Sequence, residues 1–430
     1  MPTTRHTAAP HPRAARHARR LRSRPWLRVT AVTAVAVVAF AGTAAASLYV
    51  RLRGNVETVD TSGLVDVPLP TDTEPPDPDD PNAGRAVNLL VIGSDDRSGE
   101  NGAIGGYVEG QRSDTTLLVH VSADRQRVDV VSIPRDSRVD IPACNLTGGG
   151  AIEPRRGNFN DAFALGWDHG HDLESAAACT IMTVYENTGI LAEHTVIVDF
   201  SGFQGMVDAI GGVSICVPAD IDADYVDLTL AAGQHHLDGP TALNFARARK
   251  GKGLGDGSDT NRIGNQQRLV AAMVDEVFAK NVLTDVPELV GFLGAATQSL
   301  TVDPALKDAM IGLAFSLRSV RAENITFLTV PFVASTEKKN KVDWTAAADT
   351  LWANVLADRP LTEAAAPPPG TDGSGGAGGE DGTGGAGGSP AGGAPTGGAT
   401  SAPPDTPVPS QTRKAGREPF TVNDTTAVCA

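Results

Sequence analysis

Short apolar runs alternate with polar turns through the middle of the chain, between residues 86 and 358. Three of these runs, over residues 88–93, 115–121 and 127–133, open this stretch. Their lengths and their boundaries of Gly, Pro or Asp are typical of β-strands, and a short polar segment joins the second to the third as in a hairpin. If all three pair antiparallel, the C-terminal ends of the first and third strands lie beside the N-terminal end of the second.

Helical patterns follow these strands. We expect helices over residues 174–188 and 201–210, and strands over residues 194–200 and 213–217. Glycine follows each of the two helices, where it tolerates the positive φ that ends a helix. Strands that alternate with helices indicate an α/β fold. We therefore expect an α-β-α layered domain, with a central mixed sheet covered by helices on both faces.

A further helix is predicted from Asp238, because Pro240 is tolerated in a first turn, and it leads into Arg247 and Arg249. The loop after it, KGKGLGDGS, lacks the G-x-x-x-x-G-K-[ST] pattern and follows no strand, which excludes the nucleotide-binding interpretation. His235 and His236 are adjacent, so their side chains diverge, and we interpret them as part of a loop and not as a metal pair.

A longer amphipathic helix begins at Asp259. Its apolar positions recur at helical spacing and predict a stripe that packs in the core, formed by Ile263, Val270, Val274 and Val277.

The N-terminal segment is basic and precedes an uncharged stretch. Residues 1–28 contain eight arginines and no acidic residue, and residues 29–50 contain no charged residue. A stretch of this length can span a bilayer as a helix, and arginine-rich flanks stay in the cytoplasm. We expect a cytoplasmic segment (1–28), a single transmembrane anchor (29–50) and an extracytoplasmic body. A cleaved signal peptide, with small residues at 43–47, is the alternative, and it also places the body outside the cytoplasm.

Composition divides the rest of the chain. Residues 51–85 are rich in Pro and Asp and predict a disordered stalk, followed by the globular domain over 86–358. Residues 359–430 form a low-complexity tail of Pro, Gly, Ala, Ser and Thr, disordered except for a short apolar end expected to dock on the body. Beyond residue 28, 28 basic residues face 51 acidic ones. That balance excludes free nucleic-acid binding by the main body.

Four cysteines, Cys144, Cys179, Cys216 and Cys429, are spread along the chain, and no CxxC spacing supports a zinc site. An even number in an oxidising compartment favours disulfides. Three pairings can be drawn, and our hypothesis is Cys144–Cys179 with Cys216–Cys429.

Charged residues gather where the first three predicted strands meet. Asp95 and Arg97 follow the first strand, Arg112 and Asp114 precede the second, and Arg135 follows the third. Carboxylates at one sheet edge suit Mg²⁺, which takes one or two of them and fills its other positions with water and phosphate oxygens. Arginines suit the same phosphate, because the guanidinium pairs bidentately with its oxygens. Turn chemistry with solvated arginines is the alternative for any single strand end.

A second group of polar residues lies around the helix that begins at Asp259. Arg262 and Gln266 are four residues apart and share a face in its first two turns. The N-terminus of a helix favours anions through its free N–H groups and its dipole, so these side chains would complete a pyrophosphate-sized site. A plain N-cap for Asp259 and a surface position for Arg262 are the alternatives.

Several motifs together resemble the LytR-CpsA-Psr family of actinobacterial type. They occur in the family's order over residues 86–280 and read NLLVIGSDDR, RSDTTLLVHVS, VDVVSIPRDS, NFNDAF, VDFSGFQGMVDAIGGVSICVP, LDGPTALNFARAR and SDTNRIGNQQ. The resemblance implies an α/β/α domain on a single membrane anchor. It also implies a catalytic domain over 86–358 that attaches glycopolymers from polyprenyl-pyrophosphate carriers to peptidoglycan, with Mg²⁺, or Mn²⁺ as the alternative ion.

The resemblance implies roles residue by residue. Asp95 and Asp114 would be the metal ligands, and Asp259 would support Arg262 and act in proton transfer. The pyrophosphate would be held by Arg135, Arg247, Arg249, Arg262 and Gln266, with the strand-end arginines Arg97 and Arg112 beside them. Two positions depart from the family: Asn158 replaces the usual Lys, and Asn265 replaces a frequent Arg, which would make the site less positive.

The expected reaction is a phosphoryl transfer, which needs alignment and charge neutralisation more than covalent chemistry from the protein. A hydroxyl of a peptidoglycan sugar would attack the phosphorus that bears the glycan, and polyprenyl phosphate would leave. The prenyl chain would lie in an apolar cleft, with residues 200–210 as a wall or, alternatively, as ordinary core. The alternative functions are a polyprenyl-pyrophosphate pyrophosphatase and a non-catalytic prenyl-pyrophosphate-binding regulator of the envelope.

Overall fold

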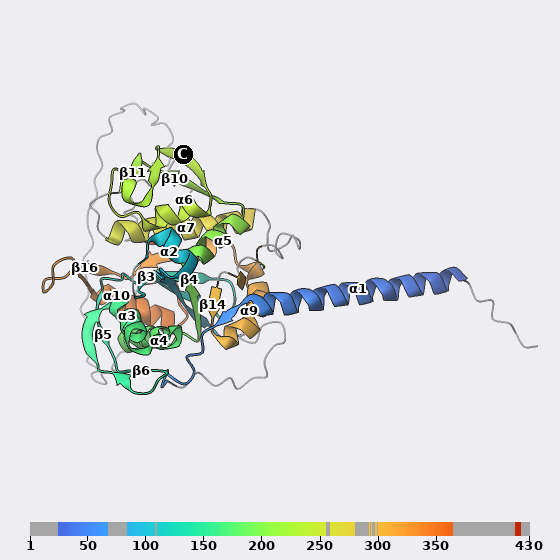
Figure 1. Ribbon diagram of the computed structural model, residues 1–430, viewed down its shortest axis with the longest axis horizontal. Coiled ribbons are helices and arrows are strands. Elements are labelled where there is room, and N and C mark those ends of the chain that lie inside the picture. Colours follow the sequence, from blue (N-terminus) through green and yellow to red (C-terminus); the bar gives the residue numbers. More distant parts are fainter. Residues whose placement is uncertain are drawn as a thin grey trace, which may run out of the picture. The chain divides into compact units, whose positions relative to one another are not determined.

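The computed structural model describes residues 25–67, 84–107, 110–254, 259–279, 300–363 and 418–422, with 292, 294, 297 and 298 (Figure 1). The chain divides into two units, Met1–Arg51 and Leu52–Ala430. Helix α1 (Pro25–Asn55) covers the segment in which the membrane anchor is predicted. Over the described residues, no helix combines the length and the apolar character that crossing a membrane requires. The predicted anchor is therefore not confirmed.

The second unit is built on an eight-stranded mixed sheet. In spatial order its strands are β1 (Glu57–Thr58), β14 (Leu300–Val302), β9 (His194–Val198), β2 (Val87–Ser94), β3 (Ser113–Val121), β4 (Val128–Ser132), β15 (Ile325–Thr329) and β18 (Phe420–Thr421). Strands β2, β3 and β4 pair antiparallel, as predicted, while β9 and β15 are parallel to β2 and β4. The predicted α/β fold with a central mixed sheet is confirmed.

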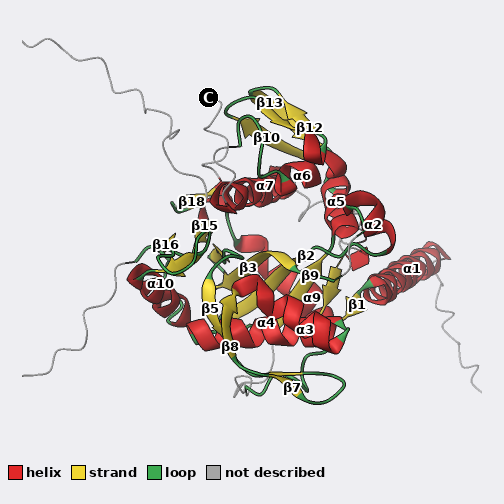
Figure 2. Cartoon of the chain, turned by 60° about the vertical axis from the view of Figure 1, so that its left-hand side comes forward, coloured by secondary structure: helices red, strands yellow, loops and turns green. Residues whose placement is uncertain are grey.

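Helices cover both faces of this sheet (Figure 2). They are α2 (Gly99–Gly105), α3 (Phe159–Gly170), α4 (Leu173–Thr188), α5 (Phe200–Ala209), α6 (Gly239–Arg247), α7 (Asp259–Ala279), α9 (Pro304–Ser316) and α10 (Ala346–Leu356). Side chains of a strand point alternately to its two faces. Leu90, Ile92 and Leu118 accordingly pack with Phe163 of α3 and Trp352 of α10 in the largest core cluster. Helices α5, α6 and α7 lie on the side of the opposite face (Figure 2).

Local sequence signals set the helix boundaries. Asp172, Asp199 and Asp238 are N-caps whose side chains accept backbone N–H bonds at the start of α4, α5 and α6. Gly189 ends α4 in the left-handed conformation, as predicted. Helix α7 begins at Asp259, also as predicted.

Within the described residues, five two-stranded ribbons lie outside the central sheet. They pair β5 (Arg138–Ile141) with β8 (Arg155–Asn158), β6 (Cys144–Asn145) with β7 (Ala151–Ile152), β10 (Val213–Val217) with β13 (Gly233–Leu237), β11 (Ile221–Ala223) with β12 (Leu228–Leu230), and β16 (Phe332–Ala334) with β17 (Val342–Trp344). The predicted strand over 213–217 is therefore present but belongs to a separate ribbon. His235 and His236 lie in β13, so their interpretation as a loop was wrong.

The disulfide between Cys144 and Cys179 ties β6 to α4, which confirms the first predicted pair. Cys216 is also disulfide-bonded. Its predicted partner, Cys429, lies outside the described residues, so that pairing stays a prediction.

Both ends of the second unit add strands to the sheet. Residues 57–58, predicted as disordered stalk, form β1 because Val59 beside them is fully buried and its N–H donates to Val302 O at 2.9 Å. Near the C-terminus, β18 pairs with β15, in agreement with the predicted docking of the apolar end. The rest of the predicted stalk (68–83) and tail (364–417 and 423–430) lies outside the described residues.

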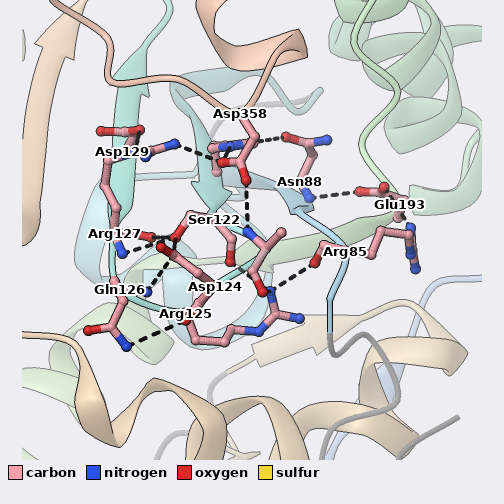
Figure 3. A network of polar contacts seen from close by, with 12 residues as sticks. Arg85, Asn88, Ser122, Asp124, Arg125, Gln126, Arg127, Asp129, Glu193 and Asp358 are labelled. Atoms are coloured by element: carbon pink, nitrogen blue, oxygen red, sulfur yellow. Dashed lines mark hydrogen bonds and ion pairs between the residues drawn. The ribbon is translucent and has the colours of Figure 1, made fainter.

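A partly buried polar network closes the end of the sheet that the β3–β4 turn forms (Figure 3). Asp358, just after α10, accepts bonds from Ala123 N at 3.0 Å and from Arg127 Nη2 at 2.7 Å, and lies 3.0 Å from His120 Nε2. Arg127 Nε also donates to Asp129 Oδ2 at 2.7 Å. These contacts attach α10 to the turn between β3 and β4.

Candidate active site

An apolar cavity lies between one face of the sheet and helices α5, α6 and α7. Its volume is about 1150 Å³, which is large for a small-molecule pocket. The sheet contributes Val91, Leu117, Val119, Val130 and Phe327 to its wall, and the helices contribute Phe203, Met206, Leu243, Leu269, Val270, Met273 and Val274. The space fits a ligand with a long apolar part.

The apolar stripe of α7 has a different role from the predicted one. Ile263 is buried in the core, as expected. Val270, Val274 and Val277 instead line the cavity. Helical spacing correctly puts these residues on one face, but it does not reveal whether that face meets side chains or space. The predicted wall on α5 is supported at Phe200, Phe203, Met206 and Ile210, which line the cavity.

Cationic side chains gather at the polar end of this cavity. Among the lining residues, five are cationic, namely Arg97, Arg247, Arg249, Lys250 and Arg262, and two are carboxylates, Asp114 and Asp199. The excess of positive charge over an apolar interior favours a ligand with an anionic head group.

Asp114, at the start of β3, lies between two arginines. Arg135 Nη1 donates to its Oδ1 at 2.6 Å, and Arg262 Nη1 lies 3.6 Å from its Oδ2. Burial would raise the pKa of Asp114, but the charges of Arg262, Arg135 and Arg249 outweigh burial and hold that pKa below its ordinary value. Asp114 therefore stays ionised and keeps the arginines in place.

Asp95 follows β2 and holds Arg97. Arg97 Nε and Nη2 donate to the two oxygens of Asp95 at 2.7 and 2.9 Å, and Nη1 donates to Gly105 O at 3.0 Å. The bond to Asp95 raises the pKa of Arg97 above its ordinary value. Arg97 is among the residues that line the cavity, and Asp95 is not.

The end of α6 adds Arg247, whose guanidinium carbon lies 4.6 Å from the centre of the Phe200 ring, in cation–π geometry. Burial and the nearby Arg97 lower the pKa of Arg247. Gln266, on α7, donates to Ala246 O at 3.2 Å and so joins α7 to α6 beside these arginines.

The structure brings most of the predicted site residues to one place. Those that line the cavity are Arg97, Asp114, Arg247, Arg249, Arg262 and Gln266, with Asp95 and Arg135 bonded to them. Arg112 is exposed and is not among the lining residues, and its carbonyl oxygen accepts a hydrogen bond from Asp95 N at 2.9 Å. The side chain of Asp259 lies outside the described residues.

The two departures from the family pattern lie away from the cavity lining. Asn158 precedes α3, where its N–H and its amide donate to Asp161 Oδ2, both at 2.9 Å. Asn265 is buried in α7. The predicted loss of positive charge at these two positions therefore does not alter the set of charged residues that line the cavity.

Several site residues were missed from the sequence. Lys250 and Tyr225 line the cavity, and Gly105 supplies the carbonyl that binds Arg97. Lys250 follows two predicted site arginines closely enough for the sequence to have indicated it. Tyr225 carries no local signal, because it reaches the site only through the fold of the β11–β12 ribbon.

Asp95 and Asp114 are the candidate carboxylate ligands for a divalent cation at this site. Asp95 and Asp114 flank Ser94 and Ser113, which are paired in the β2–β3 ladder. Within the described part of the chain, no three His, Cys, Asp or Glu side chains form a group that could hold a metal ion. Mg²⁺ needs only one or two carboxylates when water and phosphate supply the rest. The residues present fit such a shared ion.

The fold and the site together define an α/β protein that can hold a ligand with an apolar chain and an anionic head. The chain belongs to the LytR_cpsA_psr family, whose model matches residues 49–355.

Relatives with recorded names agree with this membership. The chain is 29% identical over 269 residues to "Cell wall biosynthesis protein LcpA" of Corynebacterium glutamicum, covering 58% of this chain and 50% of that protein. It is 28% identical over 214 residues to "Polyisoprenyl-teichoic acid--peptidoglycan teichoic acid transferase TagU" of Oceanobacillus iheyensis, covering 50% and 58%. The chain thus spans about half the length of these relatives. "Regulatory protein MsrR" of Staphylococcus aureus is 27% identical over 256 residues, covering 59% and 67%.

Two solved structures are similar in fold. The "LytR-Csp2A-Psr enzyme from Actinomyces oris" has a TM-score of 0.47 at 21% identity, covering 70% of this chain and 96% of that one. The "Crystal structure of B. subtilis TagV" has a TM-score of 0.45 at 20% identity, covering 64% and 97%.

Proposed function

We propose that this protein transfers a glycopolymer from a polyprenyl-pyrophosphate carrier to peptidoglycan and forms a phosphodiester link. The observation that carries the proposal is the apolar cavity of about 1150 Å³ with arginines at its polar end. A prenyl chain fits the apolar part, and a pyrophosphate fits the arginines. Family membership supports the proposal, as does the transferase name of the relative from Oceanobacillus iheyensis.

Each part of the site has a role in this reaction. Arg97, Arg247, Arg249 and Arg262 grip the pyrophosphate and neutralise the charge that it carries. A hydroxyl of a peptidoglycan sugar attacks the phosphorus that bears the glycan, and the bond to the second phosphate breaks. Polyprenyl phosphate leaves, still held by its chain in the cavity. Family resemblance assigns the accompanying proton transfer to Asp259.

Mg²⁺, or Mn²⁺ in its place, is the cofactor that we propose. Asp95 and Asp114 would hold it, and it would supply positive charge to the phosphate oxygens. Both carboxylates bond to arginines here, at 2.7 Å for Arg97 and 2.6 Å for Arg135. We expect Asp95→Asn with Asp114→Asn to abolish Mg²⁺ binding measured by calorimetry, because this variant has neither of the proposed carboxylate ligands.

The location proposed for the body is outside the cytoplasm, next to the membrane that carries the lipid substrate. The disulfide between Cys144 and Cys179 supports this, because such bonds form and persist in oxidising compartments. The partners proposed for this protein are the polyprenyl-linked glycan and the peptidoglycan acceptor.

The deciding experiment supplies purified full-length protein with a polyprenyl-pyrophosphate-linked glycan and Mg²⁺, with and without peptidoglycan fragments. We expect a glycan–peptidoglycan product that depends on the acceptor, and a strong loss with Arg262→Ala but not with Arg155→Ala, an exposed arginine on β8. Free glycan phosphate without acceptor would make the protein a pyrophosphatase. Binding without turnover would make it a regulator, as the name of the relative from Staphylococcus aureus suggests for that protein.

A further inference from the structure

We propose that the hydroxyl of Tyr225 is a positioning group that holds the segment Arg247–Lys250 and so aims two arginines at the anionic head group. The inference rests on the proposed function for its substrate, and on hydrogen bonds within the chain for its geometry. Tyr225 belongs to the short helix η1 (Asp224–Val226) between β11 and β12 and lines the cavity.

The phenol oxygen is bonded to three backbone groups of one segment. It accepts a hydrogen bond from Arg249 N and another from Lys250 N, the latter at 3.2 Å. It donates to Arg247 O at 3.4 Å. One oxygen thus bonds to the last residue of α6 and to two of the three residues after it, where a helix leaves backbone groups without intrahelical partners.

This segment needs an external support. Ala248 leaves the helix with an extended conformation, at φ −67° and ψ 123°, so Arg249 no longer belongs to a helical turn. Arg247, Arg249 and Lys250 also place three positive charges within four residues, and like charges repel. The bonds to Tyr225 hold these residues together before any anion is present.

The next residues are held by the same ribbon through backbone contacts. Asp222 and Lys252 exchange N–H···O bonds at 3.2 and 3.0 Å. Gly251 and Gly253 lie very close to the ribbon. A Cβ added to Gly251 would be 2.0 Å from Asp222 O, and a Cβ added to Gly253 would be 2.2 Å from Asp220 O. Gly251 and Gly253 therefore serve close packing against the start of the ribbon, and the ribbon and residues 250–253 form one supporting unit.

The exposure of Tyr225 separates a role in placing the arginines from a role in stabilising the fold. Its side chain is 58% exposed, so its ring contributes little to the core. Loss of the hydroxyl should therefore change the placement of the arginines more than the stability of the fold. Phe200 supports Arg247 from its other side through the ring contact at 4.6 Å.

The test compares Tyr225→Phe with Tyr185→Phe, a matched control on α4 at the opposite face of the sheet. Hydrogen exchange of the full chain should show the Arg249 and Lys250 amides exchanging about tenfold faster in Tyr225→Phe alone. Farnesyl pyrophosphate should bind that variant about tenfold more weakly in calorimetry, while farnesol binding stays unchanged. Melting temperatures of both variants should stay within a few degrees of the wild type.

Unchanged exchange and unchanged farnesyl pyrophosphate affinity in Tyr225→Phe would overturn the inference. Equal weakening of farnesol and farnesyl pyrophosphate would also overturn it, because the effect would then concern the cavity and not the head group. If the wild type bound no farnesyl pyrophosphate, the proposed function would fail, while the exchange rates would still decide whether Tyr225 holds the segment.

Discussion

Arg262 Nη2 donates to the main-chain carbonyl oxygen of Asp114 at 2.9 Å, although 148 residues separate the two in the chain. The Arg262 side chain is only 2% exposed, and its Nη1 lies 3.6 Å from Asp114 Oδ2. The contact joins the start of β3 to the first turns of α7. Since α7 forms one wall of the cavity, this pair sets the polar end of the cavity against the sheet.

Arg262→Lys should lower kcat/KM for the proposed transfer by at least about tenfold, although the charge is kept. A lysine ammonium cannot reproduce the planar fork that reaches both the carbonyl and the carboxylate of Asp114. Steady-state kinetics with the lipid-linked glycan would measure the effect, with Arg155→Lys as the control on an exposed strand. Equal kinetics for Arg262→Lys and the wild type would show that the fork geometry is not needed.

The stability that Asp114 contributes should depend on pH. The pKa of Asp114 is lower in the folded state than in the unfolded chain, so its contribution is present at neutral pH. That contribution is lost as the pH falls below about 4, through the lowered pKa. Urea unfolding of the wild type and Asp114→Asn between pH 7 and 3 should show a difference in unfolding free energy that shrinks at acid pH. A constant difference would contradict this assignment.

Asp129 should show the opposite dependence. Burial raises the pKa of Asp129 in the folded protein, despite its bond to Arg127 (Figure 3). Its contribution to stability is present at acid pH and is lost as the pH rises through the raised pKa. In the same titration, Asp129→Asn should remove part of the decline in unfolding free energy above about pH 4. If the unfolding free energies of Asp129→Asn and the wild type had the same slope against pH, the raised pKa of Asp129 would be contradicted.

Removing the disulfide should destabilise the domain strongly. The bond closes a loop with a sequence separation of 35 residues, and a loop of this size restricts the unfolded chain by about 3 to 4 kcal/mol. Cys144→Ala with Cys179→Ala should lower the unfolding free energy by that amount in urea titrations. Both cysteines are buried, so the alanines add a small packing loss to that amount. Equal midpoints for wild type and variant would show that the bond is not needed for stability.

Strand β18 should contribute a limited and separable amount of stability. Val422 is fully buried and the Phe420 ring stacks on Phe327 at 5.2 Å, but only two residue pairs join β18 to β15. Val422→Asp should cost about 2 to 3 kcal/mol, because the strand can leave the sheet instead of burying the charge.

Phe420→Asp is the matched variant for this strand. It should cost about the same amount as Val422→Asp, measured by urea unfolding, and the two substitutions together should not add, because either one releases the same strand. Fully additive losses in the double variant would show that the strand does not leave the sheet as a unit.

Much of the framework was predictable because its signals are local. The antiparallel order of β2, β3 and β4 follows from three apolar runs and a hairpin-length turn. The starts of α6 and α7 follow from Asp238 with Pro240 and from Asp259. The gathering of Asp95, Asp114 and Arg135 at one sheet edge follows from the same strand directions.

Other features depend on partners that no local pattern identifies. Arg97 bonds to Asp95 and to Gly105 O at the end of α2, and Arg112, which the sequence placed at the site, is exposed. The end strands β1 and β18 are too short to show periodicity, and they form only because β14 and β15 offer unpaired edges.

The amino-acid sequence by itself determined the types and the order of the main elements, together with the charged residues at their ends, because caps, glycines and apolar spacing act over a few residues. Tertiary structure alone decided that the apolar faces of α7 and the sheet enclose a cavity. It also decided that Tyr225, from a separate ribbon, bonds to the segment that carries two of the arginines. Such features depend on distances between residues far apart in the chain, which only the packing of the whole domain sets.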